Sequence, residues 1–226
     1  MPAVASTLAD LTARRSTPAA PLITFYDVST GERVELSGTT MANWVAKTSN
    51  FLVDDLDAEV GTRLRIGLPS HWLRHVWLLS AWNVGAVVVA DAAEIGVSGP
   101  ELVADEPRRV AASLRPLGGP FAEEPDGFLD MTREVPGHSD HFVGFDPPAP
   151  SSTAVELPGR TATHAELLDT VSPDPRRLLL GPRTLLEDAE ALIAACTGDG
   201  SLVVVTSGTA DEIARIADQE SAEPIL

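Results

Sequence analysis

The side chains best suited to hold a metal ion are histidines in two short stretches. His71 and His75 stand four residues apart, so a helix would place both imidazoles on one face. In a second, loop-forming stretch, His138, Asp140 and His141 offer two imidazoles and a carboxylate. The first pair lacks the glutamate of a zinc protease motif, and a polar loop is the commoner meaning of the second. We therefore expect no metal site, and the loop residues remain the weak candidates for one.

Groups that could act as nucleophiles are scarce. The single cysteine, Cys196, lies in an apolar run, which is typical of a small buried hydrophobic residue. The single lysine, Lys47, falls inside an expected helix, so one amine at most is available for a Schiff base or a phosphate contact. The G-x-S-x-G turn that Ser-His-Asp catalysis needs does not occur. We expect no catalytic residue and no cofactor.

Small polar residues follow two apolar runs that are expected to be buried strands, at 63–68 and 202–205. In open α/β sheets, ligands bind at the carboxyl ends of the strands. Asp211 and Glu212, which follow the second run, suit the start of a helix and would repel a phosphate there. The candidate ligand-binding residues at these two strand ends are Ser70, Thr206, Ser207, Gly208 and Thr209.

The composition bounds the class of protein. The chain has 226 residues, 44% of them hydrophobic, and a formal net charge of −17. Such a chain can bury one core, and its acidity argues against a nucleic-acid partner. It has no apolar stretch long enough for a membrane span, and Arg14 and Arg15 follow the weakly apolar start instead of preceding it. We expect a cytoplasmic protein with no membrane partner.

The first half of the chain contains a hairpin and a strand–helix–strand unit. Strands are expected at 21–28 and 32–36, and then a helix capped by Ser37 or Thr39 that ends near residue 52. A strand at 63–68, a helix at 71–83 with Ser70 as its cap and Gly85 as its stop, and a strand at 86–89 follow. Residues 91–99 are expected to form a loop. Residues 101–117 are expected to form a short helix with Pro107 in its first turn.

The second half repeats the strand–helix–strand pattern. A strand at 151–157 and a helix at 164–171 are expected, the helix capped by Thr163 with Glu166 in a capping box. Strands at 177–180 and 202–205 flank a helix at 184–195, and Asp211 is expected to cap a last helix. The fold class is therefore α/β, a layered sandwich with a mostly parallel sheet. Residues 1–20 are expected to be a helix and linker, and 21–226 one domain with an irregular segment at 118–150.

The order of these motifs resembles the N-terminal part of the adenylate-forming (AMP-binding, acyl-CoA synthetase-like) enzymes. The resemblance rests on TTMANW at 39–44, GTR at 61–63, LPS at 68–70 and GAVVV at 85–89. Thr163-His164 and the segment 177–205 are similar to the parts that follow the phosphate loop in that family. The chain is also similar to a group of short AMP-binding-like proteins of high-GC, actinobacterial bacteria.

Between the two matching parts, the resemblance implies a phosphate loop of the form T-S-G-T-T-G-x-P-K-G, whose backbone amides and lysine hold the nucleotide phosphates. The corresponding residues, 151–160, have no Gly-rich turn and no lysine, and they place Glu156 where an anion would lie. The family's later aspartates and the catalytic lysine of its C-terminal domain also have no counterpart before Leu226. We expect that the loop is absent and that adenylation is lost.

Two functions from different classes follow. The first is a pseudoenzyme that binds or regulates a protein partner, or associates with itself, through the retained scaffold. The second is a minimal binder of a nucleotide or acyl ligand, or an enzyme with a divergent site, at the carboxyl ends of the strands. The missing glycines and lysine favour the first. A decayed gene product is a third reading, but coherent caps and apolar faces argue against drift.

Overall fold

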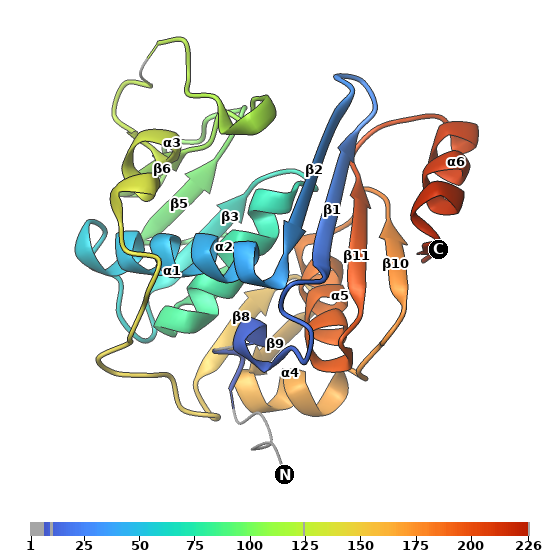
Figure 1. Ribbon diagram of the computed structural model, residues 1–226. Coiled ribbons are helices and arrows are strands. Elements are labelled where there is room, and N and C mark those ends of the chain that lie inside the picture. Colours follow the sequence, from blue (N-terminus) through green and yellow to red (C-terminus); the bar gives the residue numbers. More distant parts are fainter. Residues whose placement is uncertain (1–6, 10, 124, 226) are drawn as a thin grey trace.

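The computed structural model describes residues 7–9, 11–123 and 125–225, and these form two sheets with helices between and around them (Figure 1). In this part of the chain, one sheet has seven strands in the order β7-β6-β5-β3-β4-β8-β9. Its strands are β3 (Arg63–Gly67), β4 (Val87–Val89), β5 (Ile95–Ser98), β6 (Arg108–Ala111), β7 (Leu129–Asp130), β8 (Thr153–Leu157) and β9 (Arg160–Thr163). All neighbours are parallel except β8 and β9.

The second sheet has five strands within the described residues, in the order β12-β10-β11-β1-β2. They are β1 (Pro21–Asp27), β2 (Glu32–Ser37), β10 (Arg177–Leu180), β11 (Ser201–Val205) and β12 (Glu223–Pro224). Only the β1–β2 hairpin is antiparallel among these pairs. The expected α/β class with mostly parallel pairing is thereby confirmed, with the two strand–helix–strand units placed in separate sheets.

Three long helices lie between the sheets: α1 (Gly38–Asp54), α2 (Trp72–Val84) and α5 (Leu185–Gly198) (Figure 1). Every residue of α2 except Asn83 is buried, as expected for a helix that is apolar on all sides. One hydrophobic cluster joins side chains of both sheets to these helices, including Phe25, Leu64, Trp77 and Leu192. The α2 helix is therefore the centre of the core.

The remaining helices cover the periphery. Helix α6 (Ala210–Glu220) lies on the outer face of the five-stranded sheet, where Ile216 and Ala217 pack against Leu179, Val203 and Val205. Two shorter helices follow strands of the seven-stranded sheet, α3 (Met131–Glu134) and α4 (His164–Thr170). Within the described ranges, three short 3-10 helices complete the elements: η1 (Leu11–Arg14), η2 (Pro116–Gly118) and η3 (Val135–Gly137). No helix of the described residues has both the length and the apolarity that a membrane crossing needs.

Two expectations between residues 91 and 117 are wrong. Residues 95–98 form strand β5 instead of a loop, and 108–111 form strand β6 instead of a helix. Both strands pair in parallel within the seven-stranded sheet. Pro107 precedes β6 and so does not interrupt its hydrogen bonds. The short run Arg108–Ala111 has two half-buried and two buried residues, a pattern set by its place in the sheet and not by helical spacing.

Two helix caps also differ from expectation. His71, and not Ser70, caps α2, because its Nδ1 accepts a hydrogen bond from the amide of Leu73 at 3.1 Å. Thr209, and not Asp211, caps α6 in a capping box with Glu212. The cap expected from Thr163 is confirmed, and of the two alternatives Ser37 and Thr39 it is Ser37 that caps α1. Thr184, expected as the first residue of a helix, instead caps α5.

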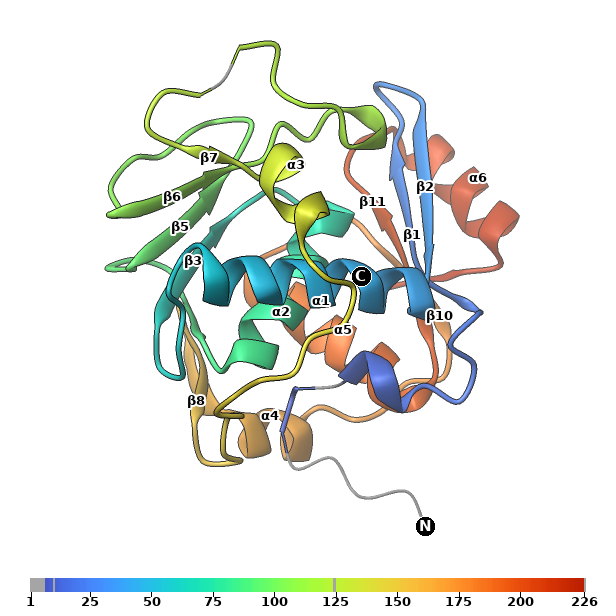
Figure 2. The same cartoon turned by 60° about the vertical axis from the view of Figure 1, so that its left-hand side comes forward.

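Residues 138–150, which we call the strap, run from η3 across α1 toward β8 (Figure 2). Two side chains of α1 hold the backbone of this segment. Lys47 Nζ donates to the carbonyls of Pro136 at 3.0 Å and His138 at 2.5 Å. Asn50 Nδ2 donates to the carbonyls of Ser139 at 2.9 Å and of residue 141 at 3.1 Å. The strap is thus fixed to α1 although it has no regular structure of its own.

Candidate functional site

The hairpin of β8 and β9 corresponds in motif order to the phosphate loop of adenylate-forming enzymes. Leu157 pairs with Arg160, so only Pro158 and Gly159 connect the two strands. Gly159 has a φ of +83°, the conformation that a type II turn requires after a proline. The connection is a tight turn and leaves no free length of backbone to surround a phosphate.

The carboxylate of Glu156, next to this turn, is paired with an arginine. Arg63 Nη1 lies 2.5 Å from Glu156 Oε2, and Arg63 Nε donates to the carbonyl of Ala92 at 3.0 Å. The guanidinium and the carboxylate neutralise one another at the strand ends. Neither group is left over to attract an anion.

Small-ligand sites have volumes of roughly 300–1,000 Å³, and a cavity of about 330 Å³ opens at the carboxyl ends of β3, β4 and β8 beside the first turn of α5. Its apolar lining comes from Ile66, Val89, Leu157, Pro158, Leu185 and Leu186. The polar residues of the lining are engaged elsewhere. Arg65 forms a two-pronged ion pair with Glu106, and Thr184 Oγ1 donates to Glu187 at 2.7 Å in a capping box. The walls therefore suit an apolar group better than a phosphate.

Ser70 lies beside this cavity but does not line it. Its side chain is buried, and its Oγ accepts hydrogen bonds from the amide of Arg183 at 3.2 Å and from Arg74 Nη1 at 3.4 Å. Arg74 also donates to Asp188 Oδ2 at 2.6 Å. Ser70 thus belongs to a polar contact between α2 and the start of α5.

The second group of candidates, residues 206–209, follows β11 in the other sheet. Ser207 Oγ donates to Asp27 Oδ1 at 2.7 Å and accepts from the amide of Ser29 at 3.1 Å. Partial burial alone would raise the pKa of Asp27, but hydrogen bonds from Ser29, Ser207 and Thr30 lower it to about 2. Thr209 caps α6. These hydroxyls serve the hairpin turn and the helix start, and Ser70 lies in a different sheet layer.

The histidine pair of α2 is part of the helix packing. The ring of His71 lies 4.4 Å from that of Phe25, and burial, followed by the nearby His75, lowers the pKa of His71 to about 3. Burial also lowers the pKa of His75, whose Nδ1 lies 3.2 Å from the carbonyl of His71. Both imidazoles are therefore neutral at physiological pH.

The loop candidates for a metal are spread along the strap. His138 Nε2 lies 2.9 Å from Asp55 Oδ2, and its Nδ1 lies 3.6 Å from Asp54 Oδ2. Asp140 and His141 follow it at the exposed surface. Within the described ranges, no three His, Cys, Asp or Glu side chains gather closely enough to hold an ion.

Cys196 and Lys47 occupy structural positions. Burial raises the pKa of the Cys196 thiol to about 12, so it is not a thiolate at neutral pH. The amine of Lys47 donates to two backbone carbonyls beneath the strap. Lys47, the one lysine of the chain, is therefore bound to the start of the strap and is not available at the β8–β9 turn.

The sequence did not lead us to the buried ion pair of Arg74 and Asp188. Asp188 is fully buried, and Arg183 Nε lies 4.0 Å from its second oxygen. A signal was present, because Asp188 falls within the apolar stripe of α5 between Leu185 and Leu192. An acid at such a position needs a buried partner.

Comparison with known proteins identifies a relative by sequence and a group of solved structures with a similar fold. A TIGR03089 family protein of Mycobacterium tuberculosis is 31% identical over 220 residues, which cover 92% of this chain and 87% of that protein. No protein-family model matches the chain.

Solved structures of synthetases share the fold. An acyl-CoA synthetase of Brucella canis matches 96% of this chain with a TM-score of 0.75 and 14% identity. The N-terminal domain of FACL13 from Mycobacterium tuberculosis matches 96% with a TM-score of 0.69 and 12% identity. The chain spans 46% of the first structure and 61% of the second. At these identities the likeness establishes the fold, which is that of the N-terminal part of acyl-CoA synthetases.

Proposed function

The chain belongs to the TIGR03089 family, and we propose that it acts in the cytoplasm as a non-adenylating relative of acyl-CoA synthetases that binds a protein partner. The scaffold of the N-terminal part is retained in both sheets, while the groups needed to hold ATP phosphates are replaced. A binding role uses the retained scaffold and does not need the groups that hold ATP phosphates.

The two-residue turn at Pro158 and Gly159 carries the proposal. A phosphate loop works because several successive amides point at the phosphate oxygens. Pro158 has no amide hydrogen, and Leu157 and Arg160 pair with one another across the turn. The turn therefore offers Gly159 alone, which is too few donors for a triphosphate.

Charge at the strand ends supports the same conclusion. Glu156 is balanced by Arg63, and the only lysine is fixed to the carbonyls of Pro136 and His138. A triphosphate bound here would meet the Glu156 carboxylate, while the guanidinium of Arg160 at the end of the turn is directed to Thr170 Oγ1, at 2.5 Å, and to Glu190 Oε1, at 3.8 Å. The uncompensated repulsion disfavours nucleotide binding.

An assay of pyrophosphate release tests the proposal. The purified chain is incubated with MgATP and a panel of short, long and aromatic carboxylic acids, with an active acyl-CoA synthetase as positive control. We expect release equal to that of the buffer. ATP-dependent release that is abolished by a substitution in the hairpin, such as Gly159→Val, would belong to this chain and would refute the proposal.

A second candidate function, binding of an acyl group, is favoured by the cavity at the carboxyl ends of β3, β4 and β8. Its apolar walls and volume of about 330 Å³ suit a short acyl chain. A ligand that binds only the folded state raises the melting temperature by mass action. A thermal-shift screen with fatty acids, acyl-CoA, AMP and ATP tests this function. Stabilisation by acyl compounds that disappears in Leu186→Trp, which fills the cavity, would support it.

A further inference from the structure

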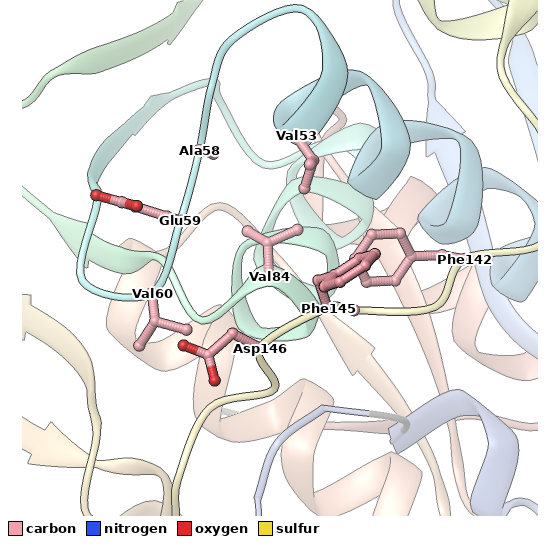
Figure 3. Close-up of a pocket in the computed structure, with 9 residues that line it drawn as sticks. Val53, Ala58, Glu59, Val60, Val84, Phe142, Phe145 and Asp146 are labelled. Carbon is pink, nitrogen blue, oxygen red and sulfur yellow. The ribbon is translucent and has the colours of Figure 1, made fainter.

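A second cavity lies under the strap, at the carboxyl ends of α1 and α2. It has a volume of about 260 Å³ and is walled by Val53, Val60, Val84, Phe142 and Phe145 (Figure 3). The two phenylalanines come from the strap, and the valines come from α1, the loop after it and α2. The cavity is therefore a separate site, which shares no lining residue with the cavity at the carboxyl ends of β3, β4 and β8.

The strap is held so that this cavity persists. Lys47 and Asn50 bind its first half to α1 through the carbonyls described above. At its other end, Pro148 packs against Gly85, where an added Cβ would lie 3.2 Å from Pro148 Cβ and 2.8 Å from a methyl of Val60. Both ends are anchored, so Phe145 is presented from a fixed backbone.

Apolar side chains are exposed at the mouth of the cavity. Phe145 is completely exposed, at 107% of the reference area, whereas the nearby Val143, which is also exposed, does not line the cavity. Val53 is exposed at 40%. An aromatic side chain can bury roughly 150–250 Å² in an interface, and exposed apolar patches of this kind mark interaction sites. A partner that covers Phe145 gains this burial.

Two carboxylates border the apolar walls. Glu59 and Asp146 line the cavity, Asp146 beside Val60 and Glu59 with its side chain directed away from the phenyl rings (Figure 3). Within the part of the chain that the structure describes, neither side chain has a hydrogen-bond or ion-pair partner. A cation beside a phenyl ring is attracted by the ring's π face, and the carboxylates add to that attraction. The cavity therefore matches a group with an apolar stem and a positive end.

We propose that this cavity, which we call the Phe145 pocket, docks a lysine or arginine side chain flanked by apolar residues on a protein partner. The side chains of these residues combine a methylene stem with a cationic head. The net charge of −17 would steer a basic partner toward the surface. The inference rests on the proposed function, for which it names a surface and a kind of partner.

A second copy of the chain does not fit the pocket as well. It carries 33 acidic residues against 16 basic ones, and its one lysine is engaged with the strap carbonyls. Two such copies would repel one another over long range. A basic protein therefore fits the Phe145 pocket better than a second copy of the chain does.

The test is an NMR titration of the full chain with two peptides, each N-acetylated and C-amidated. One has a lysine between pairs of leucines, and the other has neutral norleucine in place of the lysine. We expect saturable shifts of the amides of Val60, Gly144 and Phe145 with the lysine peptide, and binding at least about tenfold weaker for the norleucine peptide.

Matched variants locate the contact. Phe145→Ala is expected to weaken binding of the lysine peptide about tenfold, whereas Val143→Ala, which removes an exposed apolar group outside the pocket, leaves it within about twofold. Glu59→Gln with Asp146→Asn is expected to weaken binding about fivefold and to flatten its salt dependence. Asp105→Asn with Asp169→Asn changes the net charge equally at exposed sites elsewhere and serves as control.

The inference would be overturned by equal binding of both peptides, by unchanged binding in Phe145→Ala, or by hexylammonium binding as tightly as the lysine peptide. The last would assign the pocket to a free amine instead of a protein. Shifts that depend on protein concentration without peptide would point to self-association and also contradict it. A failure of the proposed function can be told apart from a failure of this inference. It would appear as pyrophosphate release, or as chemical-shift changes at the β8–β9 turn on addition of MgATP, and not as a change in peptide binding.

Discussion

His164 and Lys47 are two polar side chains that the fold uses to fix segments in place. His164 is fully buried and accepts a hydrogen bond at Nδ1 from the amide of Leu8 at 3.1 Å. This bond attaches the N-terminal segment to the start of α4. Burial lowers the pKa of His164 to about 4, because a protonated ring would lose hydration and would place a second hydrogen against the Leu8 amide.

The free energy of unfolding should therefore fall as the pH drops below the pKa of a histidine in the unfolded chain. The unfolded state binds a proton near pH 6.5 and the folded state only near 4, so this part of the stability is complete above 6.5 and is lost as the pH falls toward 4. His164 alone should lower the free energy of unfolding by about 2 kcal/mol between pH 7.5 and pH 5. Urea unfolding of the wild type and of His164→Asn, which keeps an acceptor for Leu8, measures it. An equal pH dependence in both proteins would contradict the assignment.

Lys47 should be needed for an ordered strap. Lys47→Met removes two charge-assisted hydrogen bonds to backbone carbonyls, and we expect a loss of about 1–3 kcal/mol with faster proteolysis within 138–150. Lys47→Arg, which can still reach a carbonyl, should be intermediate. Limited proteolysis with mass spectrometry locates the cleavage. Cleavage at the wild-type rate would show that Asn50 and the apolar contacts suffice.

At the scale of elements, sequence patterns predicted the parts with strong periodicity or strong caps. Both strand–helix–strand units, the β1–β2 hairpin and the Thr163 cap were expected and are confirmed. Strands β5 and β6 were missed because four-residue runs at the middle of a sheet carry too little pattern. Their conformation is decided by pairing of β5 with β3 and of β6 with β5, contacts that sequence alone does not show.

The contact between α2 and α5 depends on the buried pair of Arg74 and Asp188. Asp188→Ala should lower the free energy of unfolding by about 3–5 kcal/mol, because it leaves the guanidinium buried without its partner. The apolar replacement Arg74→Met with Asp188→Leu should cost less than the single change. Urea or thermal unfolding of these two variants, and of Arg74→Met and Asp188→Leu as single changes, forms the test. A double variant as unstable as the sum of the single changes would argue against this coupling.

The β8–β9 turn should depend on the left-handed conformation of Gly159. Nothing lies within 4 Å of a Cβ added there, so Gly159→Ala should cost about 1–2 kcal/mol through backbone strain alone. Gly137→Ala is the matched control, since its Cβ also meets open space and its φ is not in the left-handed region. Chemical unfolding compares them. Equal stability of the two variants would contradict the turn geometry.

At the scale of the whole molecule, the candidate site was predictable in part. The motif order led to the β8–β9 segment and to the strand ends, and the fold agrees with the N-terminal part of acyl-CoA synthetases. Ligand binding by Ser70 and residues 206–209 stays a prediction, and the hydroxyls of Ser70, Ser207 and Thr209 make internal hydrogen bonds. The Phe145 pocket could not be read from the sequence, because its walls come from three segments that only the fold brings together.

The most direct test of the central claim is an NMR titration of the isotope-labelled full chain with MgATP at millimolar concentration, following the amides of Glu156, Gly159 and Arg160. We expect no saturable shift of these signals, because the turn has a single free amide and Glu156 is balanced only by Arg63. Saturable shifts centred on this hairpin would contradict the claim, since they would mean that the tight turn holds the phosphates after all.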